Sequence, residues 1–157
     1  MSELQQTSNP GEAFAGLEDL LCFDVYATSR LITRAYQPLL EHLNLTYPQY
    51  LVMVLLWEGK EHTVKSLGLR LELDSGTLSP LLKRLEQMGL ITRTRLKHDE
   101  REVGIALTDL GWQKKQEAQE IPGQMACMMC ITPAQAASLQ KQLRDLREAL
   151  KQVNLRE

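Results

Sequence analysis

The fold of this chain is decided by the stretch Asp74-Ser75-Gly76-Thr77-Leu78-Ser79-Pro80-Leu81-Leu82-Lys83-Arg84-Leu85-Glu86-Gln87-Met88-Gly89. Its leucines recur every three or four residues, as they do along the buried face of an amphipathic helix. The residues that fall largely off this face are small and hydroxylated at first and basic further on: Ser75, Thr77, Ser79, Lys83 and Arg84. Short hydroxyls can hydrogen-bond base edges or phosphates, and cations add attraction to phosphates. We therefore predict that this helix enters a groove of duplex DNA.

The ends of this helix are marked in the sequence. Asp74 or Ser75 can cap the N-terminus, and Gly89 suits the position just past the C-terminus. Pro80 lies inside the helix and lacks the amide hydrogen that one helical hydrogen bond requires. We expect a modest local distortion there.

Two alternating segments follow the helix. Ile91 to Leu96 and Val103 to Leu107 alternate as half-exposed strands do, with Lys97 to Glu102 as the polar turn of a hairpin. Residues 63–71 predict a short helix just before. The order helix, turn, helix, hairpin predicts a mainly α fold with a small β-hairpin wing, the winged helix-turn-helix.

Positive charge is concentrated in this region. Between Ser75 and Arg101 there are six basic and three acidic residues, a local charge of +3, against −2 for the whole chain of 157 residues. Arg95 and Lys97 on the hairpin are further candidates for DNA contact. A charge cluster alone would indicate only a solvated surface, but the order of the elements favours a DNA-binding surface.

Long helices are expected on both sides. One runs from about Gly16 to Leu40, and Thr46-x-x-Gln49 opens another as a capping box, with Leu51, Val54 and Leu55 inward. The last begins at the cap Thr132, where Gln135 completes a capping box, and carries an apolar stripe that suits either monomer core or dimerisation. The stripe consists of Leu139, Leu143, Leu146, Leu150 and Val153.

The chain is expected to form one domain at residues 12–157 after a flexible tail at 1–11. Within it, the DNA-reading unit spans about residues 46–110, and dimerisation helices span about 12–42 and 112–157. No secretory signal or membrane-spanning run is visible, which predicts a cytoplasmic protein without a membrane partner.

Three cysteines carry the remaining chemistry: Cys22, Cys127 and Cys130. An odd count without a secretory signal argues against a structural disulfide framework. Cys127-Met128-Met129-Cys130 lacks two further ligands at zinc-site spacing, so we expect no metal and no cofactor. A cysteine in an apolar helix is most often a small core residue, which is the plain interpretation of Cys22. If Tyr36 and Tyr47 converge on its sulfur, their hydroxyls would instead stabilise the thiolate.

Leu82 to Ile91, the pair Asp99 and Arg101, and Leu107-Thr108 resemble the MarR family of dimeric bacterial transcription regulators. The resemblance implies that Asp99 braces the hairpin and that Arg101 reaches into the minor groove. It also implies a homodimer that binds an inverted-repeat operator and forms through its N- and C-terminal helices.

Leu21-Cys22-Phe23, Tyr36 and Leu45 to Tyr50 are similar to the OhrR branch of this family, the organic hydroperoxide sensors. The resemblance implies that Cys22 is the cysteine oxidised by organic hydroperoxides and that Tyr36 and Tyr47 of the partner subunit hydrogen-bond it. In the two-cysteine class, a C-terminal cysteine then forms an intersubunit disulfide, which matches Cys127, with Cys130 as the second candidate. Formation of this disulfide would release the operator. The protein would therefore be a repressor and not an enzyme.

Two other functions are compatible with parts of the sequence. A regulator of the same fold could respond to a phenolic or other small ligand bound between its domains, with incidental cysteines. A thiol peroxidase could use Cys22, although no peroxidase motif is present.

Overall fold

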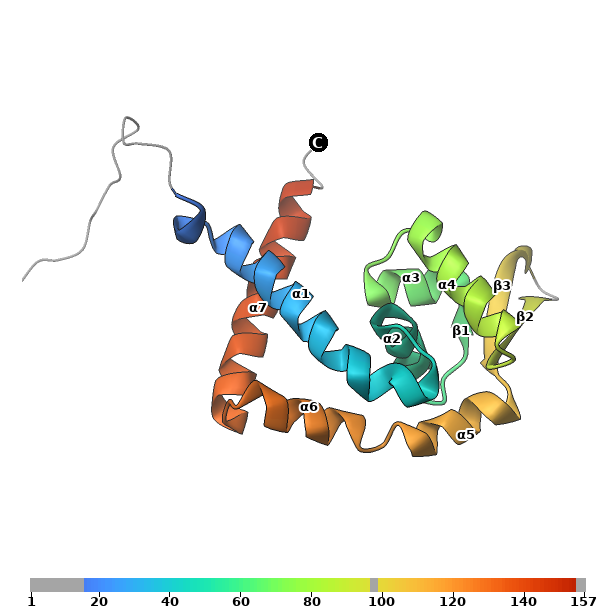
Figure 1. Ribbon diagram of the computed structural model, residues 1–157. Helices are drawn as coiled ribbons and strands as arrows, with labels where there is room; N and C mark the ends of the chain where they lie inside the picture. The colour runs from blue at the N-terminus through green and yellow to red at the C-terminus, as the bar shows by residue number, and fades with distance from the viewer. Residues whose placement is uncertain (1–15, 97–98, 155–157) are drawn as a thin grey trace, which may run out of the picture.

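The computed structural model describes residues 16–96 and 99–154, and its side-chain description also excludes residues 99–101 and 154. The described part is mainly helical with one small sheet, which confirms the predicted fold class (Figure 1). Its α-helices are α1 Leu21–Leu40, α2 Tyr47–Leu56, α3 Val64–Leu71, α4 Ser75–Gln87, α5 Asp109–Glu117, α6 Ile121–Met129 and α7 Pro133–Asn154. Short 3-10 turns at Leu17–Asp19 and Glu41–Leu43 flank α1.

Helix α4 forms as its sequence predicts. The Asp74 carboxylate accepts a hydrogen bond of 2.8 Å from the backbone amide of Thr77, which caps the first turn. Gly89 has a φ of +71°, a left-handed conformation that glycine adopts at low cost just past a helix end. Leu78, Leu82 and Leu85 are fully buried. The helix continues through Pro80, so the expected distortion does not interrupt it.

The wing is a three-stranded antiparallel sheet in the order β1-β3-β2, formed by β1 His62–Thr63, β2 Ile91–Leu96 and β3 Asp99–Leu107. The predicted turn at Lys97 to Glu102 was too long, because β3 already begins at Asp99 and pairs with Leu96 beyond a register shift. The sequence prediction also missed β1. Its two residues are a strand only because His62 and Thr63 pair with Ile105 and Gly104.

Helix α2 has the predicted capping box, in which the Thr46 amide donates to Gln49 Oε1 at 2.9 Å. The predicted inward face was partly wrong. Leu55 is buried, but Leu51 and Val54 are exposed while Val52 and Met53 are buried. The core lies where α2, α3, α4 and the sheet meet.

A close joint connects this core to α5. The indole nitrogen of Trp57 donates to the Gly111 carbonyl at 2.9 Å, and this bond is buried. The Gly111 backbone also lies against Leu90, and a Cβ at this position would come closer than 3.0 Å to the Leu90 carbonyl oxygen. Glycine is therefore required by space at this joint.

Helices α5 and α6 carry the chain from the wing to the start of α7, which passes behind α1 in the view of Figure 1. Glu72, at the end of α3, pairs with Lys151 at 2.7 Å and with Arg147 at 3.5 Å, so α7 also contacts the helix-turn-helix. Within the described ranges, no helix combines the length and apolar character that crossing a membrane requires.

Candidate nucleic-acid interface and thiol site

Helix α4 presents a polar face opposite its buried leucines. The predicted DNA-contacting residues of this helix are all exposed: Ser75, Thr77, Ser79, Lys83 and Arg84. The small side chains cluster in the first turns, where they leave the backbone accessible, and the cations follow. This surface can approach a phosphate backbone closely and hydrogen-bond base edges.

The wing adds cations beside α4. Arg95 is exposed on β2. Lys97 and the side chains of Asp99 and Arg101 lie outside the described residues, so their predicted roles stay predictions.

Arg93 was not among the predicted contacts, yet it is turned toward α4. It shares the strand face of buried Ile91, and its Nη1 lies 3.9 Å from Glu86 Oε2. Within residues 16–96 and 99–154, its buried Nε has no hydrogen-bond partner. Residues two positions apart on a strand share a face, so the sequence already placed Arg93 on the same face as Ile91. This alternation could have identified Arg93 as a residue that faces α4.

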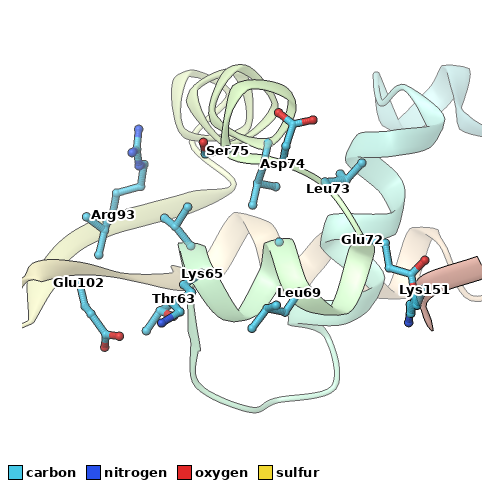
Figure 2. A pocket seen from close by; sticks show the side chains of 14 residues that line it. Thr63, Lys65, Leu69, Glu72, Leu73, Asp74, Ser75, Arg93, Glu102 and Lys151 are labelled. Carbon is cyan, nitrogen blue, oxygen red and sulfur yellow. The ribbon is translucent and has the colours of Figure 1, made fainter. Parts of the chain in front are cut away.

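A pocket of about 900 Å³ opens beside the start of α4, between α3, the wing and the end of α7 (Figure 2). Figure 2 shows Arg93 and Glu102 at one end and Glu72 with Lys151 at the other, with exposed Leu69 between them. The pocket also includes Ser75, so it adjoins the polar face of α4. Charges of both signs line it, and it therefore has no single electrostatic preference.

Tyr36 and Tyr47 come together, as the thiol-site prediction requires. Their ring centroids are 4.5 Å apart, and Tyr50 joins them at 5.8 Å from Tyr36. Burial raises the pKa of Tyr36 above its ordinary value of 10.0, and the neighbouring phenols raise it further. Burial likewise raises the pKa of Tyr47. Both phenols therefore keep their protons at neutral pH and remain hydrogen-bond donors. Sequence reasoning did not assign Tyr50, the third ring of this cluster.

Cys22 is exposed in the first turn of α1, so the interpretation of Cys22 as a core residue was wrong for the single chain. Tyr36 follows fourteen residues later on the same helix. At about 1.5 Å of rise per residue, their backbones are about 21 Å apart, beyond the reach of any side chain. Cys22 does not meet Tyr36 within one chain.

The two C-terminal cysteines sit at the end of α6 and are also exposed and free. Cys130 follows the last helical residue and has a φ of +51°, so it ends the helix in a left-handed conformation. Its amide donates to the Cys127 carbonyl at 3.2 Å, and its thiol donates to the same oxygen at 3.4 Å. The two side chains therefore share one helix end. Among the described residues, no three side chains of the metal-binding types His, Cys, Asp and Glu form a cluster.

A helix-turn-helix whose helix α4 exposes a polar and basic face, followed by a β-sheet wing, is the architecture of a DNA-binding regulator. Residues 34–118 match the family described as transcriptional regulator SarA/Rot. The chain is 50% identical over 138 residues to the organic hydroperoxide resistance transcriptional regulator of Bacillus subtilis, covering 88% of this chain and 94% of that protein.

Among solved structures, reduced AbfR bound to DNA matches with a TM-score of 0.72 and 37% identity, covering 87% of this chain and 94% of that one. Disulfide-formed AbfR matches with a TM-score of 0.59 and 42% identity, covering 83% and 91%. AbfR is a protein of Staphylococcus epidermidis. The chain thus belongs to the MarR-type, SarA/Rot family of winged-helix transcriptional regulators, and it is a regulator, not an enzyme. The thiol peroxidase alternative is thereby excluded.

Proposed function

We propose that this protein is a homodimeric repressor that binds an inverted-repeat operator and releases it when an organic hydroperoxide oxidises Cys22. The observation that carries the proposal is the separation of Cys22 from Tyr36 by about 21 Å along one helix. An exposed thiol and a cluster of protonated phenols in one chain can form a sensing site only if two chains meet. The name of the Bacillus subtilis relative supports organic hydroperoxide as the oxidant.

The surface of the chain supports dimerisation. Large apolar side chains stay exposed along α7 and along α1 as far as Leu31: Leu139, Leu143, Leu146, Leu150, Val153, Leu21, Val25 and Leu31. Their continuity on two long helices is typical of an interface, since monomers seldom expose large contiguous apolar patches. A two-fold arrangement would cover both helices and could bring Cys22 of one subunit to Tyr36 and Tyr47 of the other.

The same two-fold symmetry would place two α4 helices in successive major grooves about 34–36 Å apart, which accounts for an inverted-repeat operator. On each half-site, Ser75, Thr77 and Ser79 would contact bases or phosphates. Lys83, Arg84 and Arg95 would contact phosphates, with Lys97 and Arg101 extending the contact along the wing and Asp99 bracing Arg101. Such a regulator acts in the cytoplasm, where bacterial DNA lies.

The chemistry proceeds in two steps. The Cys22 thiolate attacks the terminal peroxide oxygen, so the O–O bond breaks and Cys22 sulfenic acid and an alcohol form. The Cys127 thiol of the other subunit then displaces water from the sulfenic acid and forms the disulfide, which protects Cys22 from irreversible oxidation. Tyr36 and Tyr47 would hold the Cys22 thiolate by hydrogen bonds before the first step.

The disulfide would act on DNA affinity through geometry. It brings two Cα atoms to about 4.4–6.8 Å, so closing a longer gap moves the helices that carry them. Helix α6 continues from α5, which is joined to the DNA-reading unit at Gly111. A shift in the spacing of the two α4 helices that costs about 3 kcal/mol would weaken operator binding more than a hundredfold.

Operator binding by wild type and by Cys22→Ser, each with and without cumene hydroperoxide, tests the proposal. Wild type should lose affinity at least a hundredfold after oxidation, and Cys22→Ser should not respond. A Cys22→Ser protein that still leaves the operator after treatment would reject Cys22 as the sensor.

Mixed dimers test the intersubunit bond. A Cys22→Ser subunit paired with a Cys127→Ser subunit keeps one Cys22 opposite one Cys127 and should respond. A wild-type subunit paired with the double variant keeps both cysteines only within one subunit and should not respond. The reverse pattern would show that the bond forms within a subunit.

A small ligand is the second candidate trigger, favoured by one observation. A cleft of about 870 Å³ lies between α1, α2 and α4, and Arg30, Arg34 and Arg84 line it together with Tyr47. Such a site suits an anionic phenolic compound. Loss of operator affinity on addition of salicylate under fully reducing conditions would favour this trigger over oxidation.

A further inference from the structure

We infer that Cys127 and Cys130 act in sequence: Cys130 attacks the intersubunit disulfide, so that a Cys127–Cys130 disulfide forms within one subunit and Cys22 returns to its thiolate. This inference rests on the proposed function, which supplies the hydroperoxide and the first disulfide. It assigns a role to both cysteines of the C-x-x-C segment.

The placement of Cys130 carries the inference. Its thiol donates to the backbone carbonyl of Cys127 at 3.4 Å, so its sulfur lies at the C-terminal end of α6, close to the Cys127 backbone. Both cysteines are exposed, and both stay in the same chain after the crosslink forms. A thiol tethered three residues away has an effective concentration in the millimolar range, far above that of any thiol on another molecule of a micromolar protein.

The helix end also permits the new bond. Side chains three positions apart on a helix have Cβ atoms about 5–6 Å apart, whereas a disulfide requires about 3.5–4.5 Å. The last turn must therefore tighten. It is free to do so because Cys130 already leaves the helix with a φ of +51°, and only Ile131 and Thr132 separate it from α7. In mid-helix, the same closure would break several backbone hydrogen bonds.

The exchange balances without a further reagent. The Cys130 thiolate attacks the Cys127 sulfur, the bond from Cys127 to Cys22 of the other subunit breaks, and Cys22 leaves as the thiolate. Over the whole sequence, one hydroperoxide becomes one alcohol and one water, and Cys127 and Cys130 together lose two hydrogen atoms. Cys22 is again a thiolate and can react with another molecule of hydroperoxide.

The consequence is a transient crosslink. A single equivalent of hydroperoxide would first form the intersubunit disulfide. Exchange would then remove that crosslink and leave the Cys127–Cys130 disulfide at the end of α6. Operator affinity should recover as the crosslink disappears, before any reductant is added.

The test follows wild type, Cys130→Ser and Cys22→Ser after one equivalent of cumene hydroperoxide, with thiols alkylated at timed intervals. Non-reducing electrophoresis gives the crosslink, and mass spectrometry of digested protein gives the state of each cysteine. In wild type, the crosslink should rise and then fall while the Cys127–Cys130 disulfide accumulates and Cys22 becomes alkylatable again. In Cys130→Ser, the crosslink should persist at least about tenfold longer, given the effective concentration of the tethered thiol.

Two results would overturn the inference while leaving the proposed function intact. One is a wild-type crosslink as persistent as that of Cys130→Ser, with Cys130 alkylated throughout. The other is a Cys127–Cys130 disulfide that forms equally fast in Cys22→Ser, because the pair would then be oxidised directly. A crosslink missing from both wild type and Cys130→Ser would instead contradict the disulfide of the proposed function itself.

Discussion

Gly111→Ala should destabilise this protein severely, because the added methyl group has no space. The Cβ would lie closer than 3.0 Å to the Leu90 carbonyl oxygen and 3.0 Å from a methyl carbon of Leu107. Backbone cannot give way as a flexible side chain can, so α5 must move away from Leu90. Overpacking of this kind costs about 1–3 kcal/mol. The movement would also strain the buried Trp57 hydrogen bond, worth about 1 kcal/mol.

The expected loss of about 2–4 kcal/mol is a large part of the 5–15 kcal/mol that typically stabilises a domain. Urea unfolding followed by circular dichroism, at one fixed protein concentration, measures it. Gly123→Ala on α6 is the matched control: no heavy atom lies within 4 Å of its Cβ, so alanine should stabilise the helix by about 0.5–1 kcal/mol. Equal stability of the Gly111→Ala and wild-type proteins would refute the close approach of α5 to Leu90.

The remaining predictions concern the DNA surface, the interface and the sensing site. Lys83→Ala should weaken specific and non-specific binding alike and reduce the slope of log affinity against log salt by about 1; an unchanged slope would remove Lys83 from the phosphate contacts. Leu143→Glu should give monomers in light scattering, whereas Leu69→Glu, at an exposed leucine of α3, should leave the mass unchanged; dimeric Leu143→Glu would contradict the α7 interface. Tyr47→Phe should slow oxidation of Cys22 by cumene hydroperoxide about tenfold, as loss of a hydrogen bond to a charged group worth about 1.5 kcal/mol implies. Tyr50→Phe removes a hydroxyl from the same cluster and should react at the wild-type rate, so equal slowing by both variants would count against a specific hydrogen bond from Tyr47.

The sequence was most informative where the controlling interactions are local. The stripe of leucines, the Asp74 cap and Gly89 all act within a few residues of one another, and they define α4 almost to its ends. The exposed face of α4 follows directly from that stripe, which is why its candidate DNA contacts could be named before the fold was known.

The sequence was less informative where distant segments decide the outcome. Strand β1 exists only through pairing with β3, some forty residues later. Helix α2 is apolar at every position from Leu51 to Leu56, so its periodicity could not tell which side faces the core, and Leu51 and Val54 were misplaced. The packing of Tyr36 against Tyr47 likewise depends on how α1 meets α2.

The central claim is that oxidation at Cys22 is transmitted to the two α4 helices. The most direct measurement follows operator occupancy and the oxidation state of Cys22 in the same samples during a titration with cumene hydroperoxide. Occupancy should fall in proportion to the fraction of dimer oxidised at Cys22, and a reductant should restore it. Protein fully oxidised at Cys22 that binds its operator as tightly as reduced protein would contradict the account.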